Sequence, residues 1–449
     1  MKQQAKKQTD LEELRERLNS GEMQPVRMLM GSLHPAELAR LIESLPLEER
    51  TIVWEMVDTQ LGGEILVEVS EEVRDGLIEG MQTQELIDAI EGIEVDDLAD
   101  LIADLPETLT QEVLKSLGHQ DRERLAQVLA YDEDTAGGLM NIDIVTVRPD
   151  VTIEVVMRHL RNQGKIPDGT DSIFVVDRNN KYQGALKLSR LLTNNPETPV
   201  AKIMSQDIEP IPADAPSEEV VWEFENRDLI SAPVIDSDNR LVGRITVDDI
   251  VDVIRDEAEH SLMGAVGLDE EDDMFAPATK SAKRRALWLG INLLTVLLAV
   301  SVVDIFKTTI DQLVLLAVLM PIVPSMGGIA GTQSLTIMTR AIALGQIDKT
   351  NALGIFKKEI LVGILNGFLW ALVVSLFTYL WFKDWRIGAV IAGAMSINLI
   401  VAAAAGFGIP LILKRMGTDP ALGGGVVLTT ITDVVGYFSF LGLGAIFLL

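Results

Sequence analysis

A long apolar run begins at Ala286 and reads ALWLGINLLTVLLAVSVV as far as Val303. It contains no charged side chain, and its length approaches the ~20 apolar residues that a helix needs to cross a bilayer. Four further charge-poor runs follow, so spans are predicted at about 286–306, 312–343, 359–382, 387–413 and 421–449. One such run could be a buried helix of a soluble protein, but five in succession predict a five-helix membrane domain over residues 286–449.

Basic residues near the ends of these spans predict the orientation of the chain. Three of them, Lys307, Lys383 and Arg386, fall on one side of the predicted membrane. Ten fall on the other side, which identifies it as cytoplasmic: Lys280, Lys283, Arg284, Arg285, Arg340, Lys349, Lys357, Lys358, Lys414 and Arg415. The N-terminal residues MKQQAKKQTDLEEL lack the apolar core of a secretory signal. We therefore expect a multi-pass protein in the lipid of a membrane, with its N-terminal half in the cytoplasm and its C-terminus outside.

Charge is divided unevenly along the 449 residues, which carry 38 Lys or Arg and 67 Asp or Glu. Only nine basic and seven acidic residues follow position 285, so the first 285 residues have a net charge of −31. Such an acidic surface argues against a nucleic-acid partner and favours cations. The chain has no cysteine, which excludes disulfides, thiolate metal sites and cysteine nucleophiles. It also has no phosphate-binding loop of the Gly-x-x-x-x-Gly-Lys-Ser/Thr type, and no enzymatic activity is predicted.

Residues 1–130 predict an all-α superhelical domain. Short amphipathic patterns with Pro or Gly between them run from about residue 10. Residues 33–46, LHPAELARLIESLP, align without a gap on residues 93–106, IEVDDLADLIADLP. An internal repeat of this kind is typical of stacked helical hairpins, which serve either as a docking surface or as a passive spacer.

Residues 131–255 predict an α/β unit that occurs twice, at about 137–200 and 201–255. Strand-like runs at 142–147, 172–176, 230–235 and 241–246 alternate with helical patterns at 152–162, 187–193, 217–226 and 247–257. The two copies resemble a pair of CBS modules, which commonly bind adenine nucleotides such as ATP. The resemblance implies ribose contacts at Thr246 and Asp249, whereas the first copy has Lys187 and Arg190 there. A nucleotide site and a purely structural role remain alternatives.

One acidic residue, Asp433, lies deep in a predicted span. A carboxylate at mid-bilayer depth costs about 2.5–3.5 kcal/mol on insertion scales, so it is expected to face a protein interior or an aqueous path. The other six acids after Ala286, Glu359 among them, are expected at span ends or in loops. Asp433 is therefore either a cation site or an aspartate that is protonated or hydrogen-bonded to its own helix.

Proline and glycine are expected to break the second span near this acid, at positions 321, 324, 327, 328 and 331, where freed carbonyls could meet an ion. Gly423-Gly-Gly425 is expected to loosen the helix that carries Asp433. Residues of both spans are candidates to line the ion path with Asp433: Gly328, Thr332, Gln333, Thr429 and Thr430. Carboxylate, hydroxyl and carbonyl oxygens without His or Cys suit Mg²⁺ or Ca²⁺.

The order of these parts resembles the MgtE family of magnesium channels. The resemblance rests on an acidic helical domain, a CBS pair, a connecting or plug helix with its linker (247–285) and five spans. Two of the spans contain the sequences GGIAGTQS (327–334) and TITD (430–433). The resemblance implies a homodimer in a bacterial cytoplasmic membrane, whose pore lies on the two-fold axis, with Mg²⁺ as transported and regulatory ion. It also implies sensor-like positions for nine acids: Asp96, Asp97, Asp100, Glu218, Asp228, Asp249, Asp252, Glu257 and Asp419. Ile329, Thr332, His260 and Ser261 depart from the family's usual pattern.

Electrostatics supports the same interpretation of the cytoplasmic half. Domains that share 60 acidic residues repel one another unless divalent cations lie between them, so Mg²⁺ would compact this half and low Mg²⁺ would let it open. The alternative is a set of merely solvated acidic faces. The sequence predicts a gated Mg²⁺ channel, with an ion-coupled carrier of Mg²⁺ or Co²⁺ and a membrane-anchored cation or nucleotide sensor as the other candidates.

Overall fold

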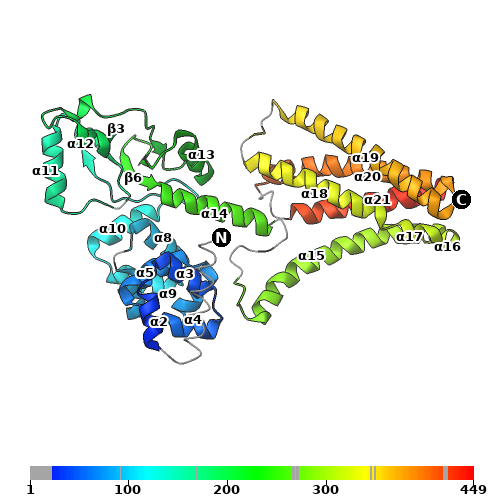
Figure 1. The fold of residues 1–449 in the computed structure, drawn as a ribbon, viewed down its shortest axis with the longest axis horizontal. Helices are drawn as coiled ribbons and strands as arrows, with labels where there is room; N and C mark the ends of the chain where they lie inside the picture. The colour runs from blue at the N-terminus through cyan, green and yellow to red at the C-terminus, as the bar shows by residue number, and fades with distance from the viewer. Residues whose placement is uncertain are drawn as a thin grey trace. The chain divides into compact units, whose positions relative to one another are not determined.

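The computed structural model describes residues 23–449, except residues 92, 168, 265–267, 269–272, 344–345, 348–349 and 418–422. The chain forms two compact units (Figure 1). The first comprises residues 1–257 with 273–276, and the second comprises residues 258–272 with 277–449. The predicted fold class is confirmed: a helical domain and a pair of small α/β modules precede five long apolar helices.

The first unit begins with short helices stacked around a common apolar core. They are α2 (Met23–Met30), α3 (Pro35–Glu43), α4 (Leu47–Trp54), α5 (Thr59–Glu68), α6 (Glu71–Ile78), α7 (Thr83–Ile90), α8 (Val95–Ala103), α9 (Glu107–Ser116) and α10 (His119–Val128). The internal repeat explains the pattern, because α3 and α8 occupy matching positions in it. Each is followed by a proline, Pro46 or Pro106, which is the N-cap of the next helix. Leu38 and Leu98 are buried at equivalent positions of the two helices.

Two three-stranded sheets of identical topology follow. One contains β1 (Thr146–Val147), β2 (Ser172–Val176) and β3 (Tyr182–Lys187), and the other contains β4 (Ile211–Pro212), β5 (Ser231–Ile235) and β6 (Leu241–Thr246). In each, the first strand pairs parallel and the third antiparallel to the middle strand, with a register shift at the same place. Lys187 and Thr246 hold equivalent positions, opposite Ser172 and Ser231. The predicted duplication is therefore confirmed, although β1 is shorter than the expected strand.

Helices accompany each sheet and lead out of the second module. They are α11 (Ile153–Gln163), α12 (Leu188–Thr193) and α13 (Ser217–Arg227), with a 3₁₀ turn at Val200–Lys202. The helix predicted to connect the modules to the membrane domain is α14 (Val247–Gly264). Asp249 closes its first turn, since its Oδ2 accepts hydrogen bonds from the Thr246 amide and from the Thr246 hydroxyl, both at 2.9 Å.

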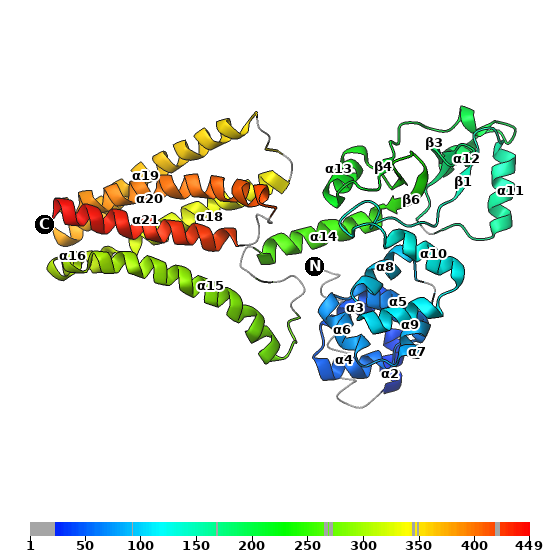
Figure 2. The same cartoon turned by 180° about the vertical axis from the view of Figure 1, so that it is seen from behind.

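The second unit contains five candidate membrane spans, Ala278–Ile305, Val314–Ala343, Ala352–Phe382, Trp385–Arg415 and Gly424–Phe447, as predicted in number. They correspond to α15 (Ala278–Ile305), α17 (Val314–Leu319) with α18 (Ile322–Ala343), α19 (Ala352–Phe382), α20 (Trp385–Arg415) and α21 (Gly424–Phe447). The short α16 (Lys307–Gln312) links the first two spans. In this unit α18 packs against both α20 and α21 (Figure 2).

The expected breaks in these helices are only partly present. The second span is interrupted at Met320 and Pro321, but Pro324 and the glycines of GGIAGTQS lie inside the continuous helix α18. These glycines give close packing instead, because a Cβ on Gly331 would lie 2.8 Å from Leu428 Cδ1 of α21. Gly423 does not loosen α21 from within, since it is the N-cap before the helix and has a φ of 71°.

Candidate functional site

A pocket of about 430 Å³ lies between α18 and α21. Its lining consists of Pro324, Ser325, Gly328, Ile329, Thr332, Gln333, Thr429 and Asp433. The α18 residues share one face because their positions follow helical three- and four-residue spacing. Asp433 is partly exposed and contributes the carboxylate of this lining. We call this feature the Asp433 pocket.

Five of the six candidate ion-path residues lie together in the Asp433 pocket: Gly328, Thr332, Gln333, Thr429 and Asp433. Thr430 is not among the lining residues, and its hydroxyl donates to the Val426 carbonyl at 2.7 Å. Sequence reasoning missed Ser325, which shares the helical face of Gly328 and Thr332 and could have been found from that spacing.

Hydroxyl geometry gives the pocket an oxygen-rich lining. Thr332 Oγ1 donates to the Gly328 carbonyl at 2.9 Å, and Thr429 Oγ1 donates to the Gly425 carbonyl at 2.8 Å. With each proton directed at its own helix, the hydroxyl lone pairs remain able to accept from a water molecule or to approach a cation. Together with the Asp433 carboxylate and the Gln333 amide, they form a hard-oxygen lining of the kind that suits a hydrated Mg²⁺ ion.

The walls of the Asp433 pocket are held by tight contacts with α20. The Asn398 amide donates to the Val323 carbonyl at 2.9 Å, and Asn398 is completely buried. A Cβ on Gly327 would meet this amide, and one on Gly436 would lie 3.0 Å from Pro324 Cγ. α18, α20 and α21 can therefore approach this closely only because glycine stands at both positions.

The expectation that Glu359 lies at a span end is wrong. α19 starts at Ala352, two turns before Glu359, and the Glu359 residue is 5% exposed. Its Oε2 accepts a hydrogen bond from the Ser334 hydroxyl of α18 at 2.9 Å. The sequence assignment failed because the polar residues Lys357 and Lys358 made the beginning of the span look like a loop.

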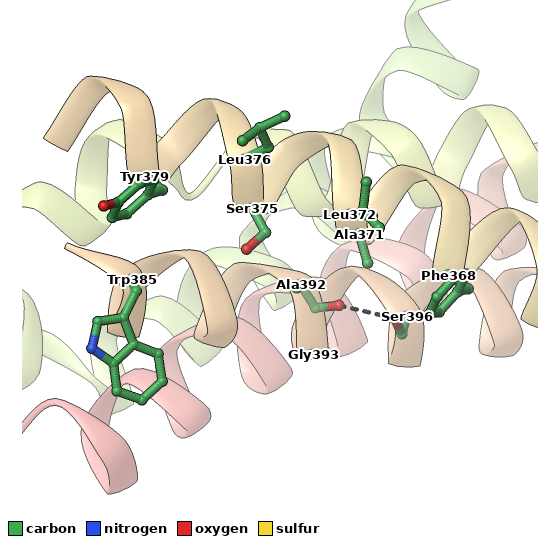
Figure 3. A pocket seen from close by; sticks show the side chains of 10 residues that line it. All are labelled: Phe368, Ala371, Leu372, Ser375, Leu376, Tyr379, Trp385, Ala392, Gly393 and Ser396. Carbon is green, nitrogen blue, oxygen red and sulfur yellow. Dashed lines mark hydrogen bonds between the residues drawn. The ribbon is translucent and has the colours of Figure 1, made fainter. Parts of the chain in front are cut away.

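A larger groove of about 850 Å³ runs between α19 and α20 (Figure 3). Its lining is apolar or aromatic apart from the hydroxyls of Ser375, Ser396 and Tyr379. The Ser396 hydroxyl donates to the Ala392 carbonyl at 2.9 Å, as drawn in Figure 3. Because no charged side chain lines this groove, it lacks the cation chemistry that the smaller Asp433 pocket has.

In the first unit, acids of α8 and α14 gather into what we call the acidic cluster: Asp96, Asp97, Asp100 and Asp249. Burial, followed by the charge of Asp249, raises the pKa of Asp96 well above its ordinary value. The same two causes raise the pKa of Asp97 to about 7. Burial also raises the pKa of Asp249 to about 6, against the opposing effect of the Thr246 amide. The cluster therefore holds negative charge at a cost in free energy.

The edge of the acidic cluster is held by Asn141. Its side-chain amide donates to Glu94 and, at 3.3 Å, to Asp96 Oδ1. Asp100 lies at the rim of the cluster, where it keeps contact with water but loses part of its solvation; this loss, and then the charge of Glu133, raise its pKa to about 7. Among the residues that the structure describes, no three Asp, Glu or His side chains form a group that could hold a metal ion. The cluster thus concentrates negative charge without forming a closed metal cage.

The remaining sensor candidates are placed less closely together. Asp252 pairs with Arg255 at 3.1 Å, and its side chain is only partly covered; this partial loss of solvation is the largest cause of its raised pKa. Glu218 is exposed in the first turn of α13, and Asp228 ends that helix with a φ of 49°. Glu257 is exposed on α14. Asp419 lies outside the described residues.

The two predicted nucleotide contacts are hydrogen-bonded to each other, since the Thr246 hydroxyl donates to Asp249 Oδ2. Polar side chains surround this end of β6: Arg244 Nη1 donates to Thr170 Oγ1 at 3.0 Å, and the Ser231 hydroxyl donates to Asp171 Oδ1 at 2.5 Å. Asp249 thus caps α14 and also belongs to the acidic cluster. In the first module, the position equivalent to Thr246 is occupied by Lys187.

Three family models together match most of the chain. A model described as "Divalent cation transporter", MgtE, matches residues 320–443. The MgtE intracellular N domain matches residues 33–134, and CBS domain models match residues 136–196 and 200–256.

Curated relatives match nearly the whole length. The chain is 29% identical over 440 residues to "Magnesium transporter MgtE" of Thermus thermophilus, covering 97% of this chain and 98% of that protein. It is 25% identical over 433 residues to the protein of the same name in Bacillus subtilis, covering 96% of both. Among solved structures, the chain is similar to the cytosolic domain of the Mg²⁺ channel MgtE in complex with ATP, with 32% sequence identity and a TM-score of 0.50. The match covers 54% of this chain and 98% of the solved one.

Proposed function

This chain belongs to the MgtE family of divalent cation transporters, and from that premise we propose that it conducts Mg²⁺ across the bacterial cytoplasmic membrane through the Asp433 pocket. The observation that carries the proposal is the convergence of Asp433 with hydroxyl and amide oxygens of α18 and α21 in one pocket. Mg²⁺ gives up water reluctantly and is commonly bound by one or two carboxylates through its hydration shell.

The ion path in this proposal belongs to a homodimer. One chain offers a single carboxylate in the Asp433 pocket, and a two-fold axis beside it would bring a second copy of Asp433 to the same ion. Two carboxylates neutralise one Mg²⁺ ion, which one cannot do. The family membership supports this arrangement.

A channel needs no chemical energy for influx. With the cytoplasm negative, each charge gains about 2.3 kcal/mol per 100 mV, so a divalent cation gains about 4.6 kcal/mol. The rival proposal is an ion-coupled carrier of Mg²⁺ or Co²⁺, with Asp433 as the shared coupling site. The signalling alternative, a membrane-anchored cation or nucleotide sensor, leaves an oxygen-lined pocket between α18 and α21 without a role.

Cytoplasmic Mg²⁺ closes this channel in our proposal, and the acidic cluster is the reason. Four carboxylates of α8 and α14, two of them with pKa values of about 7, repel one another when ionised. A divalent cation that lies among them, held largely through water, relieves this repulsion and draws the helical domain onto α14. Closing by the transported ion gives negative feedback on influx.

ATP is a second proposed ligand, at the polar end of β6 near Thr246. The support is a solved relative, the cytosolic domain of the Mg²⁺ channel MgtE in complex with ATP, together with the polar side chains of Thr170, Asp171 and Arg244 at that place. Asp249 would link the nucleotide to the acidic cluster.

Flux into liposomes tests the transport proposal. Purified protein should carry Mg²⁺ inward without a proton or sodium gradient, and Asp433→Asn should abolish the flux. Asp311→Asn removes an acid from the exposed α16 and serves as the matched control. Flux that requires a second ion gradient would favour the carrier, and flux that survives Asp433→Asn would contradict the assigned path.

A further inference from the structure

The linker that precedes the first membrane helix is docked on the helical-repeat domain. Residues 273–276 belong to the same compact unit as residues 1–257. Arg50 of α4 forms a two-pronged ion pair with Asp273 of this linker, with Nη1 to Oδ2 at 2.8 Å and Nη2 to Oδ1 at 3.2 Å. The two side chains are only 2% and 8% exposed. The pair is therefore a buried, bidentate contact between segments more than 200 residues apart in the sequence.

The site that receives Asp273 is built by the ends of two helices. Arg50 Nε donates to the Ile42 carbonyl at 3.1 Å, and Nη2 donates to the Glu43 carbonyl at 3.3 Å, so the guanidinium is fixed against the end of α3. Glu72, in the first turn of α6, accepts the Asp273 backbone N–H at 2.9 Å. The linker is thus held by its side chain and by its backbone at once.

A local turn completes the docking. Asp273 Oδ1 also accepts the Phe275 N–H at 3.0 Å, and the Asp273 carbonyl accepts the Ala276 N–H at 3.1 Å. Asp273 therefore sets the path of the residues that lead to α15. We call the contacts of Asp273 with Arg50 and Glu72 the linker clamp.

We propose that the linker clamp is a releasable contact that transmits the position of the helical-repeat domain to the first membrane helix. This rests on the proposed closing by cytoplasmic Mg²⁺. α15 begins at Ala278, five residues after Asp273, and five fully extended residues span at most about 18 Å. While the clamp holds, a larger displacement of the helical domain must also displace the start of α15.

A buried ion pair gives such a contact two distinct states. Separating Arg50 from Asp273 within the protein would leave a desolvated charge, which is strongly unfavourable, so the linker either stays fully docked or leaves its site for water. The clamp therefore provides a second route from the cytoplasmic half to the membrane half, beside the continuous helix α14. In this arrangement cation binding at the acidic cluster moves the helical domain, and the linker clamp carries that movement to α15.

The absence of cysteine from the chain permits a direct test on the full-length protein. Met274 is 89% exposed beside Asp273, so a nitroxide attached through Met274→Cys reports linker mobility without entering the site. We expect a slowly moving label at high Mg²⁺ and a freely moving one in the Asp273→Ala background. In liposomes, Asp273→Ala should raise the Mg²⁺ concentration of half-closure at least threefold and leave open-state flux unchanged. Asp273→Asn, which keeps an acceptor for Arg50, should fall between the two.

Asp238→Ala, on the exposed turn between β5 and β6, is the matched control for loss of one acid. Variants of Asp273 carry the test because Arg50 also binds carbonyls inside its own domain, and its removal could unfold that domain. An unchanged label in Asp273→Ala would overturn the docking. A released label with an unchanged closing curve would overturn the coupling. If wild-type flux is insensitive to cytoplasmic Mg²⁺, the proposed closing fails together with the coupling, while the label still decides whether the linker is docked.

Discussion

Asp97→Asn should stabilise α8 when divalent cations are absent. Burial and the charge of Asp249 raise the pKa of Asp97 from 3.8 to about 7. Three pKa units correspond to about 4 kcal/mol at 1.36 kcal/mol each, and because Asp97 keeps some contact with water and shares its protons with neighbouring acids, we expect about 2–4 kcal/mol. Asparagine removes this penalty without changing the shape of the side chain. The same substitution should abolish most of the stabilisation that Mg²⁺ gives to the wild type.

The pH dependence of this effect follows from linkage. Between pH ~4 and ~7 the folded protein keeps the Asp97 proton and the unfolded chain does not, so wild-type stability falls as pH rises through this window. The gain from Asp97→Asn should therefore be full at pH 8 and nearly absent at pH 4. This gain in stability is measured by hydrogen exchange of the α8 amides (Val95–Ala103) in the full-length protein, with Asp238→Asn as the control. Faster α8 exchange in Asp97→Asn at pH 8 without Mg²⁺ would show that the ionised Asp97 carboxylate does not destabilise this helix.

Other variants test separate parts of the account. Gly327→Val should lower the melting temperature and abolish Mg²⁺ flux because its side chain would meet Asn398, whereas Gly408→Val, which has open space around it, should change neither. Glu359→Ala should cost about 1–3 kcal/mol in thermal unfolding by leaving the Ser334 hydroxyl without its acceptor, and Glu359→Gln should recover most of this. Thr246→Val should weaken ATP binding measured by calorimetry at least tenfold; equal affinity would place the nucleotide elsewhere.

Elements that depend on the local pattern of apolar, charged and turn-forming residues could be predicted from the sequence. The five spans follow from charge-free length, and the repeat at residues 33–46 and 93–106 correctly predicted matched helices. The strands Ser172–Val176 and Leu241–Thr246, one in each sheet, were located to the residue because apolar runs and turns bound them.

What the sequence could not predict depends on contacts between distant segments. Pro324 and the α18 glycines suggested a broken helix, but proline early in a helix removes few hydrogen bonds, and the glycines serve close packing against α20 and α21. Glu359 was placed at a span end because Lys357 and Lys358 precede it, and its buried contact with Ser334, 25 residues away, has no local signal in the sequence. Likewise, no local signal pairs Arg50 with Asp273, whose contact appears only when the chain is folded.

Single-channel recording of the purified protein is the sharpest test of Mg²⁺ conduction through the Asp433 pocket. Mg²⁺ is the permeant ion, and its concentration on the cytoplasmic side is raised from micromolar to tens of millimolar. We expect discrete Mg²⁺ currents that close as this concentration rises and that are absent in Asp433→Asn. Currents that persist in Asp433→Asn, or wild-type protein that gives none, would contradict conduction through the Asp433 pocket.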